Sequence, residues 1–195
     1  YPVFGTYAVP VEETMDELNR MKKEGKIRAI GASNMNPEVL NEYCTYADIE
    51  IIQEKYSLLD THIADELLPV CQKHHVSIQA YSPLEQGLLT GKVTQDTVLS
   101  PTDVRNKNKF WAQKSRLHIL NVLQKLTPYT EKYSCSLSNL IIYLTAASLP
   151  DLHVLCGARK PEQIIDNVKT LSLNLEEADL SEMSQLFEQL RNSIR

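Results

Sequence analysis

Apolar and polar residues follow two periodic patterns along the chain, and the two patterns alternate. Short apolar runs typical of strands occur four times, and stripes of apolar residues at helical spacing lie between them. The predicted strands are residues 27–32, 49–55, 76–81 and 153–156. The predicted helices are residues 11–24, 63–73, 115–133, 136–148, 161–171 and 176–190, and one more that begins at Asn36-Pro37. This alternation indicates βα units and a parallel sheet.

One long segment, from Leu84 to about Ala112, has neither period. Gly87, Gly91 and Pro101 interrupt it. So long a connection inside a compact domain is usually a functional loop rather than a spacer. We therefore expect this loop to help form a binding site.

Four parallel strands with helices are compatible with two architectures. One is a small open doubly wound sheet that is complete in itself, and the other is half of a (β/α)8 barrel. Periodicity alone does not choose between them. No G-x-G-x-x-G motif follows a predicted strand, and polar residues cluster at the carboxyl ends of all four strands. The second feature favours a barrel, whose sites lie on that rim.

Composition excludes several classes of function. The chain has 195 residues and a formal net charge of −5, without a long basic run, so a bulk role in binding nucleic acid or a membrane surface is not expected. No apolar stretch approaches the roughly 20 residues of a membrane span. Four widely spaced cysteines, with no C-x-x-C pair, suit reduced thiols in a cytoplasmic protein. The histidines form no recognisable metal site.

Several motifs in order resemble the aldo-keto reductase family, and the likeness covers essentially the whole chain. They are residues 23–34 (KEGKIRAIGASN), Gln53, residues 80–84 (AYSPL), residues 86–92 (QGLLTGK) and residues 157–163 (GARKPEQ) with Asn167. The loop is most similar to that of bacterial inositol-utilisation and general-stress reductases. The resemblance implies one domain over residues 1–195 that is the second half of a (β/α)8 barrel, with strands 5–8, helices 4–8 and a C-terminal helix.

The resemblance also implies a binding site for NADP. Ser33, Asn34 and Gln53 would hold the nicotinamide carboxamide, and Tyr81 would cover one face of the ring. The residues expected to surround the pyrophosphate are Ser82, Pro83, Leu84, Gln86 and Gly87. The residues expected at the adenosine end, where the backbone and Arg159 would hold the 2′-phosphate, are Gly157, Ala158, Arg159, Lys160, Gln163 and Asn167.

Each of these motifs also has a purely structural interpretation. Ser33-Asn34 could cap a turn before Asn36-Pro37, and Tyr81 could be an ordinary core tyrosine. Arg159-Lys160 could be a solvated turn. However, a helix N-terminus preceded by a planar guanidinium suits a phosphate, and no acidic residue stands where an NAD ribose site would need one.

The resemblance implies a catalytic tetrad of Asp, Tyr, Lys and His, and none of the four can be assigned to a residue here. Tyr1-Pro2 resembles the pair that follows the catalytic His. We therefore expect an NADP-dependent reductase of small aldehydes or ketones whose cofactor-binding half is present and whose isolated chain is inactive. The first half of the barrel or a second chain would be needed to close the fold. The alternative is a nucleotide-binding regulatory module without turnover.

Overall fold

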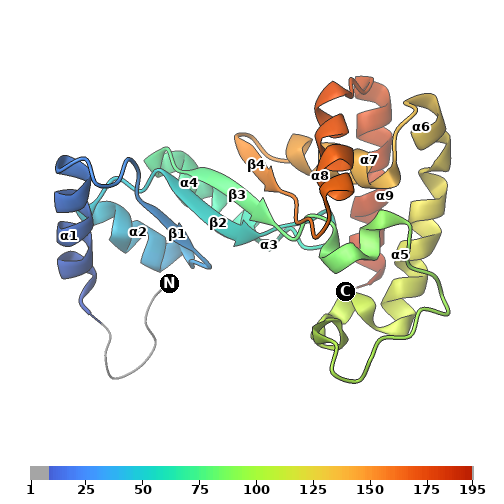
Figure 1. Ribbon diagram of the computed structural model, residues 1–195, viewed down its shortest axis with the longest axis horizontal. Coiled ribbons are helices and arrows are strands. Elements are labelled where there is room, and N and C mark those ends of the chain that lie inside the picture. Colours follow the sequence, from blue (N-terminus) through green and yellow to red (C-terminus); the bar gives the residue numbers. More distant parts are fainter. Residues whose placement is uncertain (1–8, 195) are drawn as a thin grey trace. The chain divides into compact units, whose positions relative to one another are not determined.

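Residues 9–194 are described by a computed structural model, and they form two packing units (Figure 1). Unit 1 takes the described residues through Tyr56, together with Thr61–Tyr81 and Asp151–His153. Unit 2 takes Ser57–Asp60, Ser82–Pro150 and the chain from Val154 onward. The Tyr1-Pro2 pair lies outside the described residues.

The sheet is parallel where its pairing is defined, with the strand order β1-β2-β3-β4. Its strands are β1 (Gly31–Ser33), β2 (Ile51–Lys55), β3 (Ser77–Tyr81) and β4 (Leu152–Leu155). In β2 and β3 buried and half-buried residues alternate, so that Ile52 and Ile78 lie on the buried face. The other face carries Ser33, Gln53 and Gln79 in register across three strands.

Four helices belong to unit 1: α1 (Val11–Lys23), α2 (Pro37–Tyr46), α3 (His62–Glu66) and α4 (Leu68–His74). Helix α2 begins where the sequence predicts, because the Asn36 side chain accepts a hydrogen bond of 2.8 Å from the Val39 N–H and Pro37 occupies the first turn. Helices α1 and α2 lie side by side (Figure 1).

Two predicted elements of unit 1 differ from the structure for local reasons. The helix predicted over residues 63–73 is divided at Leu67, because Pro69 has no N–H to continue the ladder of hydrogen bonds. The strand predicted over residues 27–32 is reduced to Gly31–Ser33. The Ile30 N–H instead donates to the Glu50 carboxylate at 2.6 Å, so it is not used in the sheet.

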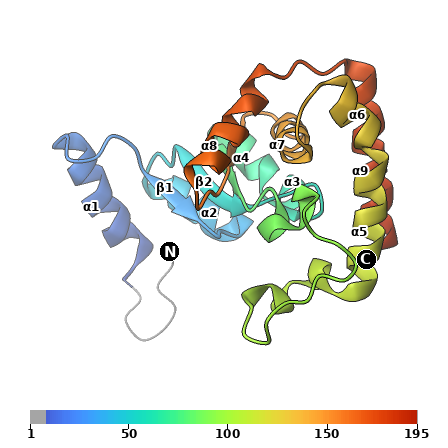
Figure 2. The same ribbon diagram turned by 45° about the vertical axis from the view of Figure 1, so that its right-hand side comes forward.

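Unit 2 is mainly helical. Its α-helices are α5 (Gln113–Lys125), α6 (Thr127–Lys132), α7 (Leu137–Ala147), α8 (Pro161–Val168) and α9 (Glu177–Ser193). Its 3₁₀ turns are η1 (Glu85–Thr90), η2 (Val104–Lys107), η3 (Lys109–Trp111) and η4 (Lys169–Ser172). The first three lie in the long loop. Helices α5 and α9 run next to each other (Figure 2).

The core of unit 2 corrects the predicted fold. In a half barrel each helix would cover a strand, but the hydrophobic cluster here joins α5, α7 and α9 to the long loop and contains no strand residue. Leu123, Leu140, Phe187 and Trp111 are all buried members of this cluster. Unit 2 therefore has a helical core of its own, which differs from the predicted arrangement of one covering helix for each strand.

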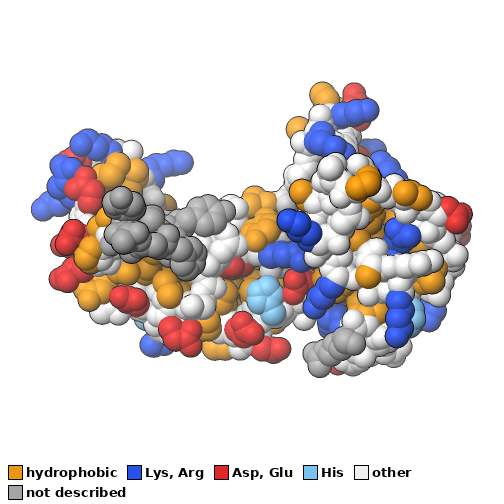
Figure 3. Space-filling view, turned by 90° about the horizontal axis from the view of Figure 1, so that it is seen from below, with side chains coloured by type: hydrophobic (Ala, Val, Ile, Leu, Met, Phe, Trp, Pro, Cys, Tyr) orange, Lys and Arg blue, Asp and Glu red, His pale blue; other side chains and the backbone are white. Residues whose placement is uncertain are grey.

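No helix within residues 9–194 is long and apolar enough to cross a membrane. On the face shown in Figure 3, Lys and Arg side chains occur in several groups.

Candidate functional site

A hydrogen-bonded cluster joins the ends of the strands in unit 1. The Ser33 hydroxyl donates to the Gln53 backbone oxygen at 2.8 Å, and the Asn34 N–H donates to the same oxygen at 3.2 Å. The Tyr81 hydroxyl donates to Asn34 Oδ1 at 2.7 Å. Asn34 has a φ of 55°, the left-handed region that asparagine adopts more readily than most residues. Four residues predicted at the nicotinamide end therefore belong to one network.

This network gives Asn34 and Tyr81 defined orientations. Asn34 Nδ2 also donates to Ser33 Oγ at 3.2 Å, so both ends of the Asn34 amide have protein partners. Ser33-Asn34, which could be a simple turn cap, is thus also hydrogen-bonded to the neighbouring strands. Amide and hydroxyl groups held in this way can present donors and acceptors to a carboxamide.

Gln79 belongs to the same group of side chains, and sequence reasoning missed it. Gln53 Nε2 donates to Gln79 Oε1 at 3.3 Å, as expected for residues that are paired across neighbouring strands. The period-two alternation of Ser77, Gln79 and Tyr81 on β3 could have indicated that Gln79 shares a face with Tyr81.

Glu54 lies on the opposite, buried face of β2 and was also missed. Its side chain is 4% exposed and accepts a hydrogen bond of 2.7 Å from the Met35 N–H. Burial raises the pKa of the Glu54 carboxyl, while the hydrogen bond from Met35 acts in the opposite direction. The buried Glu54 carboxyl thus holds the turn that follows Asn34.

We expect the melting temperature of Glu54→Gln, compared with that of the parent chain, to increase as the pH rises. Because the pKa is raised, the folded state binds the Glu54 proton more tightly than the unfolded state. The contribution of Glu54 is therefore greatest at acid pH and is lost as the pH rises through the raised pKa. Melting temperatures at about pH 4 and about pH 8 test this. Glu42→Gln, at an exposed site on α2, is the matched control, and a pH-independent difference for Glu54→Gln would contradict the account.

The turn after β3, in unit 2, contains several left-handed residues. Ser82, Glu85, Gln86 and Gly87 have φ values of 60°, 45°, 56° and 95°. Only Gly87 adopts such a value without a steric cost. The Gly87 N–H donates to the Leu84 carbonyl at 2.9 Å, and Gln86 is exposed while Pro83 is buried. The pyrophosphate-binding residues predicted between Ser82 and Gly87 therefore lie on one tight, strained turn.

From the sequence we expect the backbone N–H groups at the N-terminus of α8 to be free to hold a phosphate, and the structure differs from this expectation. The Gln163 side-chain oxygen accepts from the N–H groups of Arg159 and Lys160, at 2.7 and 3.1 Å. The side chains of Arg159 and Lys160 are exposed, as are Gly157 and Ala158, and Asn167 is half-buried. An anion here would be held by the two cationic side chains, or it would displace the Gln163 oxygen from the backbone donors.

Helix α7 packs against both stretches of unit 2 that carry predicted binding residues, the turn η1 and helix α8. Buried Asn139 donates to the Asp166 carbonyl at 2.7 Å and to Thr170 Oγ1 at 3.3 Å. The Ser136 hydroxyl donates to the Asp166 carboxylate at 3.1 Å. These bonds fix α8 to the start of α7.

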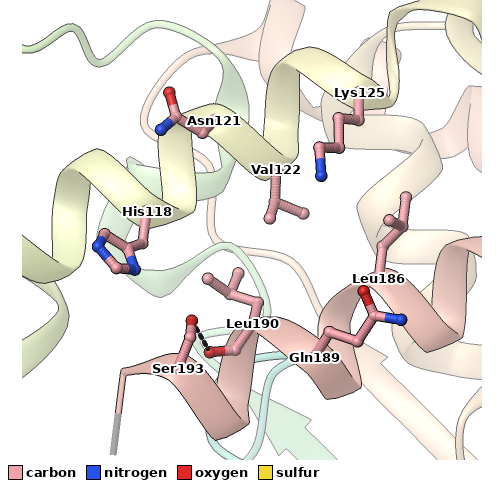
Figure 4. A pocket seen from close by; sticks show the side chains of 8 residues that line it. All are labelled: His118, Asn121, Val122, Lys125, Leu186, Gln189, Leu190 and Ser193. Carbon is pink, nitrogen blue, oxygen red and sulfur yellow. Dashed lines mark hydrogen bonds between the residues drawn. The ribbon is translucent and has the colours of Figure 1, made fainter.

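Unit 2 also has a groove of about 260 Å³ between α5 and α9 (Figure 4). His118, Asn121 and Lys125 line one wall, while Gln189 and Ser193 lie on the other. None of the residues that line this groove is a predicted cofactor ligand. Among residues 9–194, no group of three or more His, Cys, Asp or Glu side chains could hold a metal ion.

Comparison with known proteins identifies the family. The model of the Aldo/keto reductase family matches residues 5–188. The NADH-specific methylglyoxal reductase of Escherichia coli is 40% identical over 185 residues, which cover 94% of this chain and 56% of that protein. The aldo-keto reductase YhdN of Bacillus subtilis is 31% identical, over 87% of this chain and 52% of that protein.

The structure is similar to a glycerol dehydrogenase from Gluconobacter oxydans, with a TM-score of 0.86 and 26% sequence identity over 95% of this chain and 56% of that one. The chain thus spans about half the length of the relatives that it matches.

These matches overturn the prediction that the chain is only the C-terminal half of a barrel. The family model extends over residues 5–188 and the structural match over almost the whole chain. The proposed need for a second chain, which rested on that prediction, has no support. Because the family model matches residues 5–188 of the 195, the chain belongs to the aldo/keto reductase family.

Proposed function

We propose that this chain binds NADP and serves an oxidoreductase that reduces small aldehydes or ketones by hydride transfer. The observation that carries the proposal is the strand-end network of Ser33, Asn34, Gln53 and Tyr81, in which hydrogen bonds within the protein orient the amide and hydroxyl groups. Such prior orientation lowers the entropic cost of holding a reactive ring in place.

Each group in the network has a proposed task. Asn34, Ser33 and the Gln53 side chain hold a carboxamide through hydrogen bonds, and Tyr81 lies along one face of the attached ring. The Tyr81 hydroxyl already donates a hydrogen bond to Asn34. A movement of Tyr81 over the ring would therefore also move the Asn34 amide that contacts the carboxamide. The turn from Ser82 to Gly87, including Pro83, Leu84 and Gln86, surrounds the diphosphate. When bound, the nicotinamide group supplies the hydride.

The preference for NADP over NAD rests on Arg159 and Lys160. Both side chains are exposed at the start of α8, and a guanidinium matches a phosphate dianion through paired hydrogen bonds. Gly157 and Ala158 supply the backbone before the helix, and Gln163 and Asn167 are proposed to contact adenine or the phosphate.

A preference for NADH is the second candidate, and one observation favours it. The Gln163 side-chain oxygen accepts hydrogen bonds from the N–H groups of Arg159 and Lys160. These two donors are therefore not free to bind a 2′-phosphate. The Escherichia coli relative is named as NADH-specific. Separate titrations with NADPH and NADH distinguish the candidates by the ratio of the two dissociation constants.

Turnover by the chain alone is proposed to be low, because none of its residues is assigned as the proton donor that carbonyl reduction requires. A nucleotide-binding module without turnover is the alternative. Methylglyoxal, the substrate in the name of the Escherichia coli relative, is a suitable probe of the proposed carbonyl class.

A paired experiment tests the proposal. Trp111, the single tryptophan, reports binding through its fluorescence, and loss of NADPH absorbance with methylglyoxal reports turnover. We expect saturable quenching and slow or no consumption of NADPH. Rapid consumption would contradict the low turnover of the chain alone. Unchanged fluorescence and no consumption at millimolar NADPH and NADH would contradict the proposed function itself.

A further inference from the structure

A fully buried carboxylate lies beside the proposed diphosphate-binding turn, and the proposed function gives it no task. Glu85 is 0% exposed. Its Oε1 accepts from the Ser57 hydroxyl at 2.6 Å, and its Oε2 accepts from Asn108 Nδ2 at 3.1 Å. All three residues belong to unit 2. A buried charged group of this kind is costly unless its surroundings supply hydrogen bonds.

The two partners can only donate to Glu85. Ser57 Oγ already accepts from the N–H groups of Leu59 and Asp60, at 3.2 and 3.1 Å, so its hydroxyl proton remains for Glu85. Asn108 Oδ1 accepts from the Phe110 N–H at 3.0 Å, which fixes the direction of that amide. Two donors therefore face the two oxygens of Glu85, and an acceptor-only carboxylate fits this arrangement where an amide would not.

The same residues connect the turn to the long loop. Asn108 Nδ2 also donates to Gln86 Oε1 at 3.2 Å, and Trp111 Nε1 donates to the Glu85 carbonyl at 3.2 Å. Glu85 and Gln86 are both left-handed, a conformation that costs energy for a residue with a Cβ atom and persists only where its surroundings impose it. The buried contacts of Glu85 supply that constraint.

We infer that Glu85 is a positioning residue: with Ser57 and Asn108 it holds the strained turn at Gln86-Gly87 in the conformation that receives a nucleotide diphosphate. This inference rests on the proposed function, because it assumes that the turn from Ser82 to Gly87 binds the diphosphate of the cofactor. Glu85 itself has no surface exposed to a ligand, so it acts through the backbone and through Gln86.

Glu85→Gln tests the inference with little change in size. The introduced amide must direct its NH₂ toward either Ser57 or Asn108, and each of these already presents a donor. We expect NADPH to bind about tenfold more weakly, the loss typical of one hydrogen bond to a charged group. The probe 2′-AMP, which has neither phosphate of the diphosphate, should bind with unchanged affinity. Glu188→Gln, at an exposed position on α9, is the matched control.

A second substitution should restore binding if the pairing of donors and acceptors is what matters. In Glu85→Gln/Asn108→Asp, the introduced amide can donate to the introduced carboxylate, which can still accept from the Phe110 N–H. The exposed Gln86 side chain, which accepts from Asn108 in the parent chain, can turn its NH₂ toward the same carboxylate. We expect this double variant to recover most of the NADPH affinity. It should also recover the emission maximum of Trp111, which we expect Glu85→Gln to shift.

The outcomes separate the inference from the proposed function. If the parent chain binds neither NADPH nor 2′-AMP, the proposed function and the inference are both overturned. If the parent chain binds NADPH no more tightly than 2′-AMP, the turn does not contact the diphosphate, and only the inference is overturned. If the parent chain binds NADPH and Glu85→Gln binds it equally well, or loses affinity for both probes alike, only the inference is overturned. Should Glu85→Gln not fold, Ser57→Ala takes its place, with about threefold weaker NADPH binding expected and an equal affinity counting against the inference.

Discussion

Arg159→Ala is expected to weaken NADPH binding by roughly 10- to 100-fold and NADH binding by less than about threefold. The guanidinium is exposed at the start of α8, and the Gln163 oxygen already occupies the N–H groups of Arg159 and Lys160. A 2′-phosphate would therefore depend mainly on the cationic side chains, which NADH has no phosphate to engage. Dissociation constants from calorimetry for both cofactors measure the effect.

Lys169→Ala is the control for this substitution. Lys169 follows α8 at its other end and is paired with Asp166 at 3.3 Å. Its loss changes the net charge of the chain by the same amount without touching the predicted phosphate site. If Arg159→Ala weakens NADPH and NADH equally, or if Lys169→Ala has the same effect, Arg159 does not recognise the 2′-phosphate.

Phe187→Ala is expected to lower the free energy of unfolding by about 3–5 kcal/mol. Phe187 on α9 is 1% exposed and packs in the cluster that contains Leu88 and Leu89 of η1, directly after the Gln86-Gly87 turn. Removal of the ring leaves a cavity that the surrounding helices can only partly fill. Urea denaturation followed by circular dichroism measures the change.

The neighbouring substitution Leu186→Ala provides the comparison. Leu186 is only half-buried and lines the groove between α5 and α9, so its truncation should cost about 1 kcal/mol. A cost for Phe187→Ala no greater than that for Leu186→Ala would show that the cluster is not a well-packed core.

The start of α2 could be predicted from the sequence because local chemistry determines it. Asn36-Pro37 marks the start of a helix irrespective of the rest of the fold, and the structure places it there. In a parallel sheet the carboxyl ends of strands meet at one edge, so Ser33, Asn34 and Tyr81 could be expected together. Their role at the nicotinamide end came from the family resemblance and stays a prediction.

The buried acids could not be predicted, because burial depends on contacts between distant residues. The residues next to Glu54 and Glu85 in the sequence give no sign that these acids are buried. Their hydrogen-bond partners, Met35 and Asn108, are distant in the sequence and reach them only in the folded chain. The contact between Gln163 and the N–H groups of Arg159 and Lys160 likewise depends on side-chain direction, which a motif does not specify.

The architecture was mispredicted for a related reason. Periodicity shows that a helix has an apolar face, but it does not show whether that face meets a strand or another helix. Helices α5, α7 and α9 bury their apolar residues together, while a barrel pattern assigns each helix to a strand. The breaks at Pro69 and Pro128, by contrast, follow from the missing N–H of proline and could have been predicted.

The most direct test of the account is a calorimetric titration of the chain with NADPH, repeated in the presence of saturating 2′,5′-ADP. We expect saturable binding of one NADPH per chain, with an apparent affinity that falls when 2′,5′-ADP competes for the site at Arg159. The absence of any binding heat at millimolar NADPH over a range of temperatures, or binding that 2′,5′-ADP does not weaken, would contradict it.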